Sequence, residues 1–362
     1  MSTSMEPFAA PSESSDAETV GLLHLAVERK HDRTSVLRRR VATGWDDVPD
    51  WRFHRHVMRI GLYLRERGQL SAGDRVALVS TLRPEWAVAA WAALTQGVSI
   101  ATIDPALPDA EMGAQLNALA PRAVFVAGDC LDRVIARLAG TRGAGNVVVL
   151  DGQGGGQALS WSEVLDLGGS LDTAERANAF RAMVRALPPD TPALGHAVGA
   201  NGTAAWRFLS HREVVRRVQR VWMRSRVARG DVAYLTGGAP LLAASVALLA
   251  FTADGYTQVV IGTKGNELED IAMTRPHKII APVETVQCIM ETASPGPSSL
   301  WERWLTRAPR LPGFLRDDGS GRRPPSGLGG RARWLSTGAT LALPMRARAR
   351  KFVTLEIDDS LA

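Results

Sequence analysis

Residues 189–215 read PDTPALGHAVGANGTAAWRFLSHREVV, and this stretch has the layout of a phosphate-binding loop between a strand and a helix. A short apolar run leads to Gly199 and Gly202, and a helix-like segment follows them. A loop that holds a nucleotide triphosphate needs glycines for close backbone approach, hydroxyl side chains for the phosphate oxygens and a lysine to balance the charge. The glycines are present here and the lysine is missing. The stretch therefore keeps the frame of such a loop and has lost its chemistry.

The frame resembles the signature loop of the adenylate-forming superfamily, the acyl-CoA synthetases and their relatives, which reads Y-T-S-G-T-T-G-x-P-K-G-V-x-L-[ST]-H. On this alignment the remnant of the nucleotide loop consists of Gly199, Asn201, Gly202, Thr203, Ser210 and His211. The positions that differ from the motif are His196, Ala197, Val198, Ala200, Asn201, Ala204, Ala205 and Trp206. The family's lysine corresponds to Ala205, and the glycine after it corresponds to Trp206, which we expect to fill the nucleotide side of the loop. The resemblance thus implies a degenerate member of the superfamily.

A second resemblance to the same superfamily extends over about thirty residues upstream of the loop. The family's N-terminal lobe reads G-D-R-V-A-[LI], then P-E-W, then a glycine, then D-P. This chain has those elements in order at residues 73–78, 84–86, 97 and 104–105. Several fixed elements at the right spacing make this match more specific than the loop alone.

The same region also predicts the fold directly, because a strand over 75–80, a helix over 85–96 and a strand over 98–103 form a βαβ unit. Further alternation of strands and helices predicts strands at 123–127, 146–150, 232–236, 257–261 and 278–282. We therefore expect an α/β fold of stacked αβαβα layers with mostly parallel sheets, as in the N-terminal lobe of acyl-CoA synthetases. The expected organisation is a disordered tail at 1–16, an N-terminal α/β subdomain at 17–187 and a second α/β subdomain with the degenerate loop at 188–362.

The C-terminal part resembles one subclass, the long-chain fatty-acyl-CoA synthetases, through an L-G-G-R element at 328–331. It leads into a remnant of the family's adenine-binding turn, Ser336, Thr337, Gly338 and Ala339. The family's next motif, Y-G-x-T-E, binds phosphate and magnesium, and Asp358 and Asp359 stand in its place. The resemblance therefore implies that the magnesium glutamate and the C-terminal lobe with its catalytic lysine are absent.

Composition sets broader limits, since 362 residues with 45% hydrophobic and 22% charged side chains describe a globular chain with a sizeable core. The net charge of +6 comes mainly from arginine, which suits an anionic partner and equally the codon usage of a GC-rich genome. The arginines at 212–229, together with Trp206, predict an interaction surface around Arg216 and Arg217, although a solvated helix face fits the pattern too. Because the arginines are scattered among few aromatic residues, we do not expect nucleic-acid binding.

Cysteine usage and the N-terminal sequence indicate the compartment. Cys130 and Cys288 have no His or Cys at ligand spacing, so we expect neither a disulfide framework nor a metal site. Residues 1–20 are polar and acidic, unlike a signal peptide or a transmembrane segment. These features favour a cytoplasmic protein and leave peripheral membrane contact open.

Three functions remain open for a lobe of this kind. The first is a pseudoenzyme, a non-catalytic binding or scaffolding subunit with a protein partner and no catalytic residues or cofactor. The second is a residual fatty-acid–CoA ligase that another chain completes, which would use ATP or AMP, magnesium and CoA. The third is a carrier that binds a fatty acyl group or a nucleotide without turnover.

Overall fold

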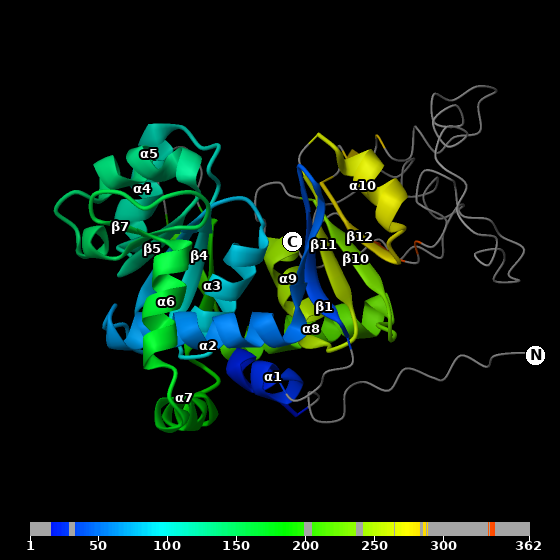
Figure 1. Cartoon of the computed structure of the whole chain (residues 1–362), viewed down its shortest axis with the longest axis horizontal. Coiled ribbons are helices and arrows are strands. Elements are labelled where there is room, and N and C mark those ends of the chain that lie inside the picture. Colours follow the sequence, from blue (N-terminus) through cyan, green and yellow to red (C-terminus); the bar gives the residue numbers. More distant parts are fainter. Residues whose placement is uncertain are drawn as a thin grey trace, which may run out of the picture.

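The computed structural model describes residues 16–28, 33–198, 205–236, 242–263, 265–282, 285–286, 288, 332 and 334–336. Two α/β halves lie side by side in it, with helices packed between their sheets (Figure 1). The tail expected at 1–16 lies outside the described residues apart from Asp16.

One half is built on a seven-stranded sheet in the order β7-β6-β5-β3-β4-β8-β9. In chain order its strands are β3 (Arg75–Val79), β4 (Ser99–Ile103), β5 (Ala123–Val126), β6 (Val147–Val149), β7 (Ala158–Ser160), β8 (Pro192–Val198) and β9 (Ala205–Ser210). Every pair in it is parallel except the β8–β9 hairpin. The hairpin brings the loop stretch to the edge of this sheet.

The other half is a six-stranded sheet in the order β13-β12-β10-β11-β1-β2. Its strands are β1 (Ser35–Val41), β2 (Gly44–Pro49), β10 (Val232–Leu235), β11 (Gln258–Ile261), β12 (Lys278–Ile280) and β13 (Trp334–Ser336). All pairs are parallel except the β1–β2 hairpin. The expected boundary between 187 and 188 does not separate the two sheets, since β1 and β2 join the later strands and β8 and β9 join the earlier ones.

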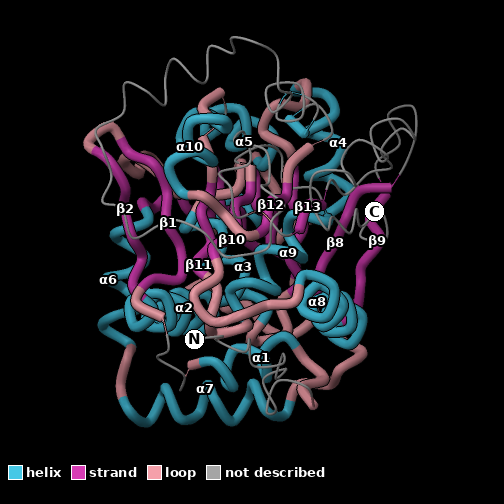
Figure 2. The backbone as a smooth tube through the Cα atoms, turned by 90° about the vertical axis from the view of Figure 1, so that its right-hand side faces the viewer, coloured by secondary structure: helices cyan, strands magenta, loops and turns pink. Residues whose placement is uncertain are grey.

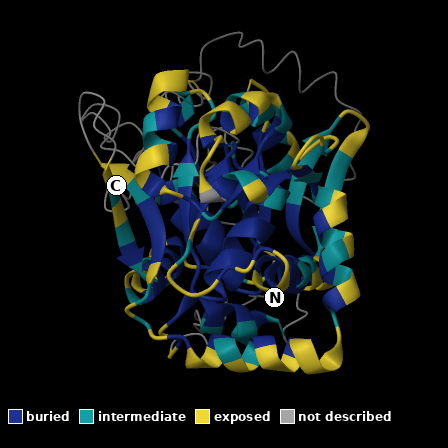
Figure 3. Ribbon diagram, turned by 90° about the vertical axis from the view of Figure 1, so that its left-hand side faces the viewer, coloured by how far each residue is buried: buried dark blue, intermediate teal, exposed yellow. Residues whose placement is uncertain are grey.

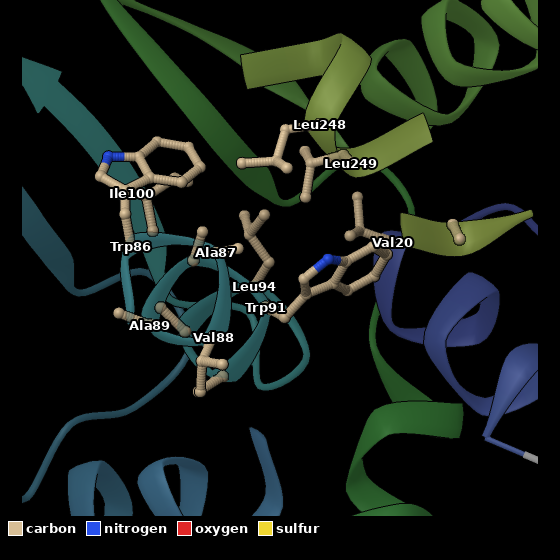
Figure 4. Close-up of a cluster of buried hydrophobic side chains, with 14 of the residues drawn as sticks. Val20, Trp86, Ala87, Val88, Ala89, Trp91, Leu94, Ile100, Leu248 and Leu249 are labelled. Carbon is tan, nitrogen blue, oxygen red and sulfur yellow. The ribbon is translucent and has the colours of Figure 1, made fainter. Parts of the chain in front are cut away.

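The layer between the sheets is the main hydrophobic core. It centres on two nearly fully buried helices, α3 (Pro84–Leu94) and α9 (Leu242–Ala253). Trp86 and Trp91 of α3 lie close to Leu248 and Leu249 of α9 in this core (Figure 4). Four further helices pack around the pair: α1 (Val20–Val27), α2 (Asp50–Glu66), α6 (Trp161–Leu171) and α8 (His211–Ser225).

Outer helices cover the remaining sheet faces. The helices α4 (Asp109–Leu119) and α5 (Leu131–Leu138) pack on the seven-stranded sheet, and α10 (Glu267–Thr274) packs on the six-stranded one. The helix α7 (Ala174–Ala186) lies at the periphery, where exposed residues gather while buried ones fill the centre (Figure 3). The result is the predicted αβαβα layering with mostly parallel sheets.

The local sequence explains where α3, the helix at the centre of this core, begins and how the chain turns after it. Pro84 occupies the first turn of α3, where its missing N–H costs no hydrogen bond. Gly97, just beyond the helix, has a φ of +77°, a left-handed conformation that glycine adopts without strain. A Cβ there would lie 2.5 Å from Leu187 Cδ1, so the turn into β4 requires glycine on two grounds.

Several elements were not predicted, among them β1, α4 and β9. In β1 the run Arg38-Arg39-Arg40 hides the strand pattern, because its charges are balanced from other strands and helices, as by Asp47 for Arg38 and Glu269 for Arg40. The helix α4 was not recognised either. The strand β9 was expected as part of a loop that leads straight into a helix, whereas residues 205–210 pair with β8.

Candidate functional site

The carboxyl ends of the parallel strands define the candidate site, because ligands of open α/β sheets bind outside those ends. In the six-stranded sheet, β10, β12 and β13 end side by side at Leu235, Ile280 and Ser336. The segments that follow β8, β10 and β13 fall outside the described residues. These segments contain seven of the predicted site residues: Gly199, Asn201, Gly202, Thr203, Thr337, Gly338 and Ala339. The site is therefore described by the residues that frame it.

The β8–β9 hairpin frames the nucleotide-loop remnant. Its register runs without interruption from Leu194↔Leu209 to Val198↔Ala205, so the strands reach residues 198 and 205 on either side of the turn. Ala197, Val198 and Ala205 are exposed at this end. None of the three can donate a hydrogen bond from its side chain or carry a charge.

Trp206 does not stand free at this end of the hairpin. Its indole Nε1–H donates to the Gln115 carbonyl oxygen of α4 at 3.1 Å, and the ring packs with the core beneath that helix. Phe208 lies on the same face, across Gly195, where a Cβ would come within 2.6 Å of its ring. The expectation that Trp206 fills the nucleotide side is thus corrected, since its side chain is bound to α4.

Ser210 begins α8 as its N-cap. Its Oγ accepts a hydrogen bond from Glu213 N at 3.3 Å, and Glu213 Oε2 accepts one from Ser210 N at 2.7 Å. These two bonds form a capping box. The backbone N–H of Ser210 is the main reason why the pKa of Glu213 lies below its ordinary value. The motif's serine therefore has a structural task at the start of the helix.

His211 is fully buried one residue further on. Its Nδ1 accepts a hydrogen bond from Val20 N at 3.3 Å, which ties the first turn of α1 to α8 across the core. Burial lowers the pKa of His211 to about 4, so the ring is neutral near pH 7 with its proton on Nε2, which lacks a partner among the described residues. The motif's histidine therefore also has a structural task.

Ser336 is the one residue of the adenine-turn remnant that the structure describes. It is buried at the end of β13, and its carbonyl oxygen accepts a hydrogen bond from Ala281 N at 3.1 Å. Thr236 N donates in the same way to the Ile280 carbonyl oxygen at 3.1 Å. These bonds hold the carboxyl ends of β10, β12 and β13 together, so Thr236 and Ser336 lie at the same end of the sheet.

Tyr234, near the same end of the six-stranded sheet, was not among the residues predicted from the sequence. Tyr234 is buried beneath Gly262, and its hydroxyl has no partner in the described part of the chain. Burial raises the pKa of Tyr234 above its ordinary value. No motif marks such a residue in the sequence, because its position depends on the packing of β11 beside β10.

Arg40 of β1 forms ion pairs with Glu269 and Asp270 of α10. Arg40 forms two hydrogen bonds to the Glu269 carboxylate, at 2.8 and 2.9 Å, and one to Asp270 Oδ1 at 3.2 Å. Asp270 also accepts from Thr263 N at 3.1 Å, although burial raises the pKa of its carboxyl. The three adjacent arginines of β1 were the signal in the sequence for partners of this kind. The bonds are consistent with a structural role for the group in docking α10.

The remaining predicted residues lie on α8. Arg216 is exposed and Arg217 is half-buried. Among the described residues, no group of three or more His, Cys, Asp or Glu side chains is placed to hold a metal ion. Cys130 and Cys288 both carry free thiols.

Comparison with known proteins fits this geometry. The model of the family described as AMP-binding enzyme matches residues 25–354. No curated protein matches the chain in sequence.

Solved structures share the fold at low sequence identity. A protein assigned as a long-chain-fatty-acid CoA ligase from Rhodopseudomonas palustris is 14% identical with a TM-score of 0.70, over 92% of this chain and 72% of its own. A long-chain-fatty-acid-CoA ligase from Archaeoglobus fulgidus is 14% identical with a TM-score of 0.68, over 92% and 60%. The adenylation domain of a carboxylate reductase from Mycobacterium chelonae is 17% identical with a TM-score of 0.68, over 97% and 59%. The chain thus spans less than two thirds of the last two proteins.

Proposed function

Because the chain belongs to the family of AMP-binding enzymes, we propose that it is a member that no longer forms adenylates and acts as a non-catalytic binding or scaffolding subunit. The observation that carries this proposal is the composition of the hairpin around the loop. The strand ends next to the turn carry Ala197, Val198, Ala205 and Trp206, where the family motif has a threonine, a serine, a lysine and a glycine. The first three lack polar side-chain groups, and the indole of Trp206 is bound to Gln115.

These substitutions matter because of what adenylation requires. The reaction joins a carboxylate to the α-phosphate of ATP, so the protein must hold three phosphates and magnesium while it positions the carboxylate. Loss of one electrostatic donor of this kind costs on the order of 10²–10³ in rate. Loss of the lysine and two hydroxyl groups together would leave little rate enhancement.

The motif residues that remain support the same reading. Ser210 caps α8 through Glu213, and His211 binds the backbone of Val20. Both residues would be retained for stability even in a lobe that binds no nucleotide. Features that build the fold have thus persisted, while side chains that would meet phosphate have changed.

We place the partner surface on the α8 side of the hairpin, around Arg216 and Arg217, and leave out Trp206, whose indole packs against α4 on the opposite face. Val198, 39% exposed, and the exposed Arg216 offer an apolar and a cationic contact there, and arginine is among the residues enriched at protein interfaces. The free thiols favour a cytoplasmic location. No helix in the described part of the chain is long and apolar enough to span a bilayer.

Ligand titration tests the proposal against its two alternatives. We expect magnesium to add nothing to the effect of ATP on the melting temperature, and isothermal titration calorimetry to show no micromolar, magnesium-dependent affinity, because a ligand that binds only the folded state must raise its stability. Micromolar, magnesium-dependent binding of ATP would contradict the proposal in favour of a residual ligase. Stabilisation by palmitoyl-CoA without turnover would instead identify an acyl carrier.

A further inference from the structure

A group of cationic side chains lies between the β8–β9 hairpin and α8, on the face opposite Trp206. Side chains alternate along a strand, so Arg207 points away from α4, to the face on which Leu209 packs into the central core. His196 is the cross-strand partner of Arg207 and shares that face. The helix α8 packs against both strands (Figure 2) and contributes Arg217 and Arg220. We call His196, Arg207, Arg217 and Arg220 the hairpin–helix cluster.

The positive charge of this cluster is not balanced within the described residues. Its neighbouring carboxylate is Glu213, which is already bound to the backbone and hydroxyl of Ser210. Neither Arg207 nor Arg217 forms an ion pair with a described residue. Some arginines elsewhere do, as Arg38 does with Asp47 and Arg133 with Asp109, and others, such as the exposed Arg52 and Arg55, do not. What distinguishes the cluster is that the charges of Arg207 and Arg217 act together on His196, where the hairpin meets α8.

Two nitrogen atoms of the cluster lack acceptors. His196 Nδ1 and Arg217 Nη1 are buried without a hydrogen-bond partner in the described part of the chain, and a buried polar group without a partner destabilises the fold. Burial, followed by the charge of Arg220, lowers the pKa of Arg217. Burial, followed by the charges of Arg207 and Arg217, lowers that of His196. These unmet donors and the mutual repulsion would both be relieved by an oxyanion.

We propose that the hairpin–helix cluster binds the phosphate group of a small phosphate-bearing ligand. Guanidinium groups donate paired hydrogen bonds to phosphate oxygens, and donors that converge from β8, β9 and α8 suit a tetrahedral group with two negative charges better than a planar carboxylate. The site uses side chains of the strands and the helix, apart from the turn at 199–204. The proposal includes no magnesium, since among the described residues the carboxylate beside the cluster is Glu213, which is bound to Ser210. The inference holds whether or not the lobe is catalytic.

The test is binding of inorganic phosphate, pyrophosphate and AMP, without magnesium and at constant ionic strength, followed by calorimetry and thermal shift. We expect the double variant Arg207→Gln/Arg217→Gln to bind at least about tenfold more weakly, as loss of charge-assisted hydrogen bonds requires. The matched control is Arg176→Gln/Arg185→Gln, which removes the same charge from exposed positions of α7 and should leave affinity unchanged. Tighter binding of AMP than of inorganic phosphate would identify a phosphomonoester as the ligand, and the reverse would identify the free ion. Absence of binding, or equal loss in both double variants, would overturn the proposal.

A second readout does not depend on the folding of the variants. The charged groups that act on His196 are Arg207 on β9 and Arg217 on α8, with Arg220 and Glu213 next to Arg217 on the same helix, while β8 itself and the adjacent β4 carry no other charge. A bound phosphate, which stays anionic throughout the range in which an imidazole titrates, would raise the pKa of His196. The pKa of His196 can be followed by NMR in the unmodified protein. If phosphate leaves that pKa unchanged, the site is not the one proposed.

Discussion

Replacement of Ser210 by alanine separates a structural role from a nucleotide-binding role for the conserved frame. The substitution removes the Oγ that accepts from Glu213 N at 3.3 Å and leaves the first turn of α8 with an unpaired N–H. An N-cap serine is worth about 1 kcal/mol, and in a chain of this size that lowers the melting temperature by roughly 2 °C. Ser210→Asp should restore most of the loss, because aspartate is an equally good cap and favours the positive end of the helix dipole.

The chain contains a matched control for this prediction. Ser160 and Glu163 form a capping box at the start of α6 with the same distances, 3.3 Å from Glu163 N to Ser160 Oγ and 2.7 Å from Ser160 N to Glu163 Oε2. Ser160→Ala should therefore destabilise the protein to a similar degree, measured as the urea midpoint of unfolding. The reasoning is refuted if Ser210→Ala leaves stability unchanged while it alters the response to a nucleotide, or if Ser210→Asp is less stable than Ser210→Ala.

Three further predictions concern buried groups. Burial lowers the pKa of His24 and of His211 to about 4 each, below the unfolded value of about 6.5. Between these two values the unfolded state binds more protons than the folded state, so the urea midpoint should be constant above about pH 6.5 and fall as the pH drops toward 4. A midpoint that does not change with pH would contradict buried neutral rings. Arg33 donates to Asp50 at 2.9 Å and to the Phe251, Thr252 and Thr257 carbonyl oxygens at 3.1, 2.7 and 2.9 Å, so Arg33→Met should cost at least about 3 kcal/mol in chemical denaturation, and a loss below 1 kcal/mol would show that this network is not stabilising. Gly262→Ala should cost about 2 kcal/mol, because its Cβ would overlap the Tyr234 ring, and a neutral effect would argue against the buried position of that tyrosine.

Sequence patterns predicted the layers of this fold well, because their signals are local. Alanine-rich α3 between two apolar strands identifies a βαβ unit from neighbouring residues alone. By contrast, β1 carries three consecutive arginines, and its assignment depends on Asp47 nearby and on Glu269 more than two hundred residues away. A strand stabilised by distant partners has no local apolar pattern to reveal it.

The site was predictable to a smaller extent for the same reason. Ser210 and Glu213 have the spacing of a capping box, a local signal for the helix start that the loop resemblance obscured. The bond from Val20 N to His211 spans 191 positions, so no reading of the motif could assign that histidine to the packing of α1. Trp206 was expected in the loop, whereas it lies on β9, and its partner Gln115 belongs to α4, which was not predicted either.

The central claim, that the lobe no longer forms adenylates, is tested most directly by ATP–pyrophosphate exchange with saturated fatty acids of graded length and magnesium. The purified chain should give exchange no greater than a sample without fatty acid, and Trp206→Gly should leave that background unchanged. Fatty-acid-dependent exchange by the chain alone, altered by Trp206→Gly, would contradict the account.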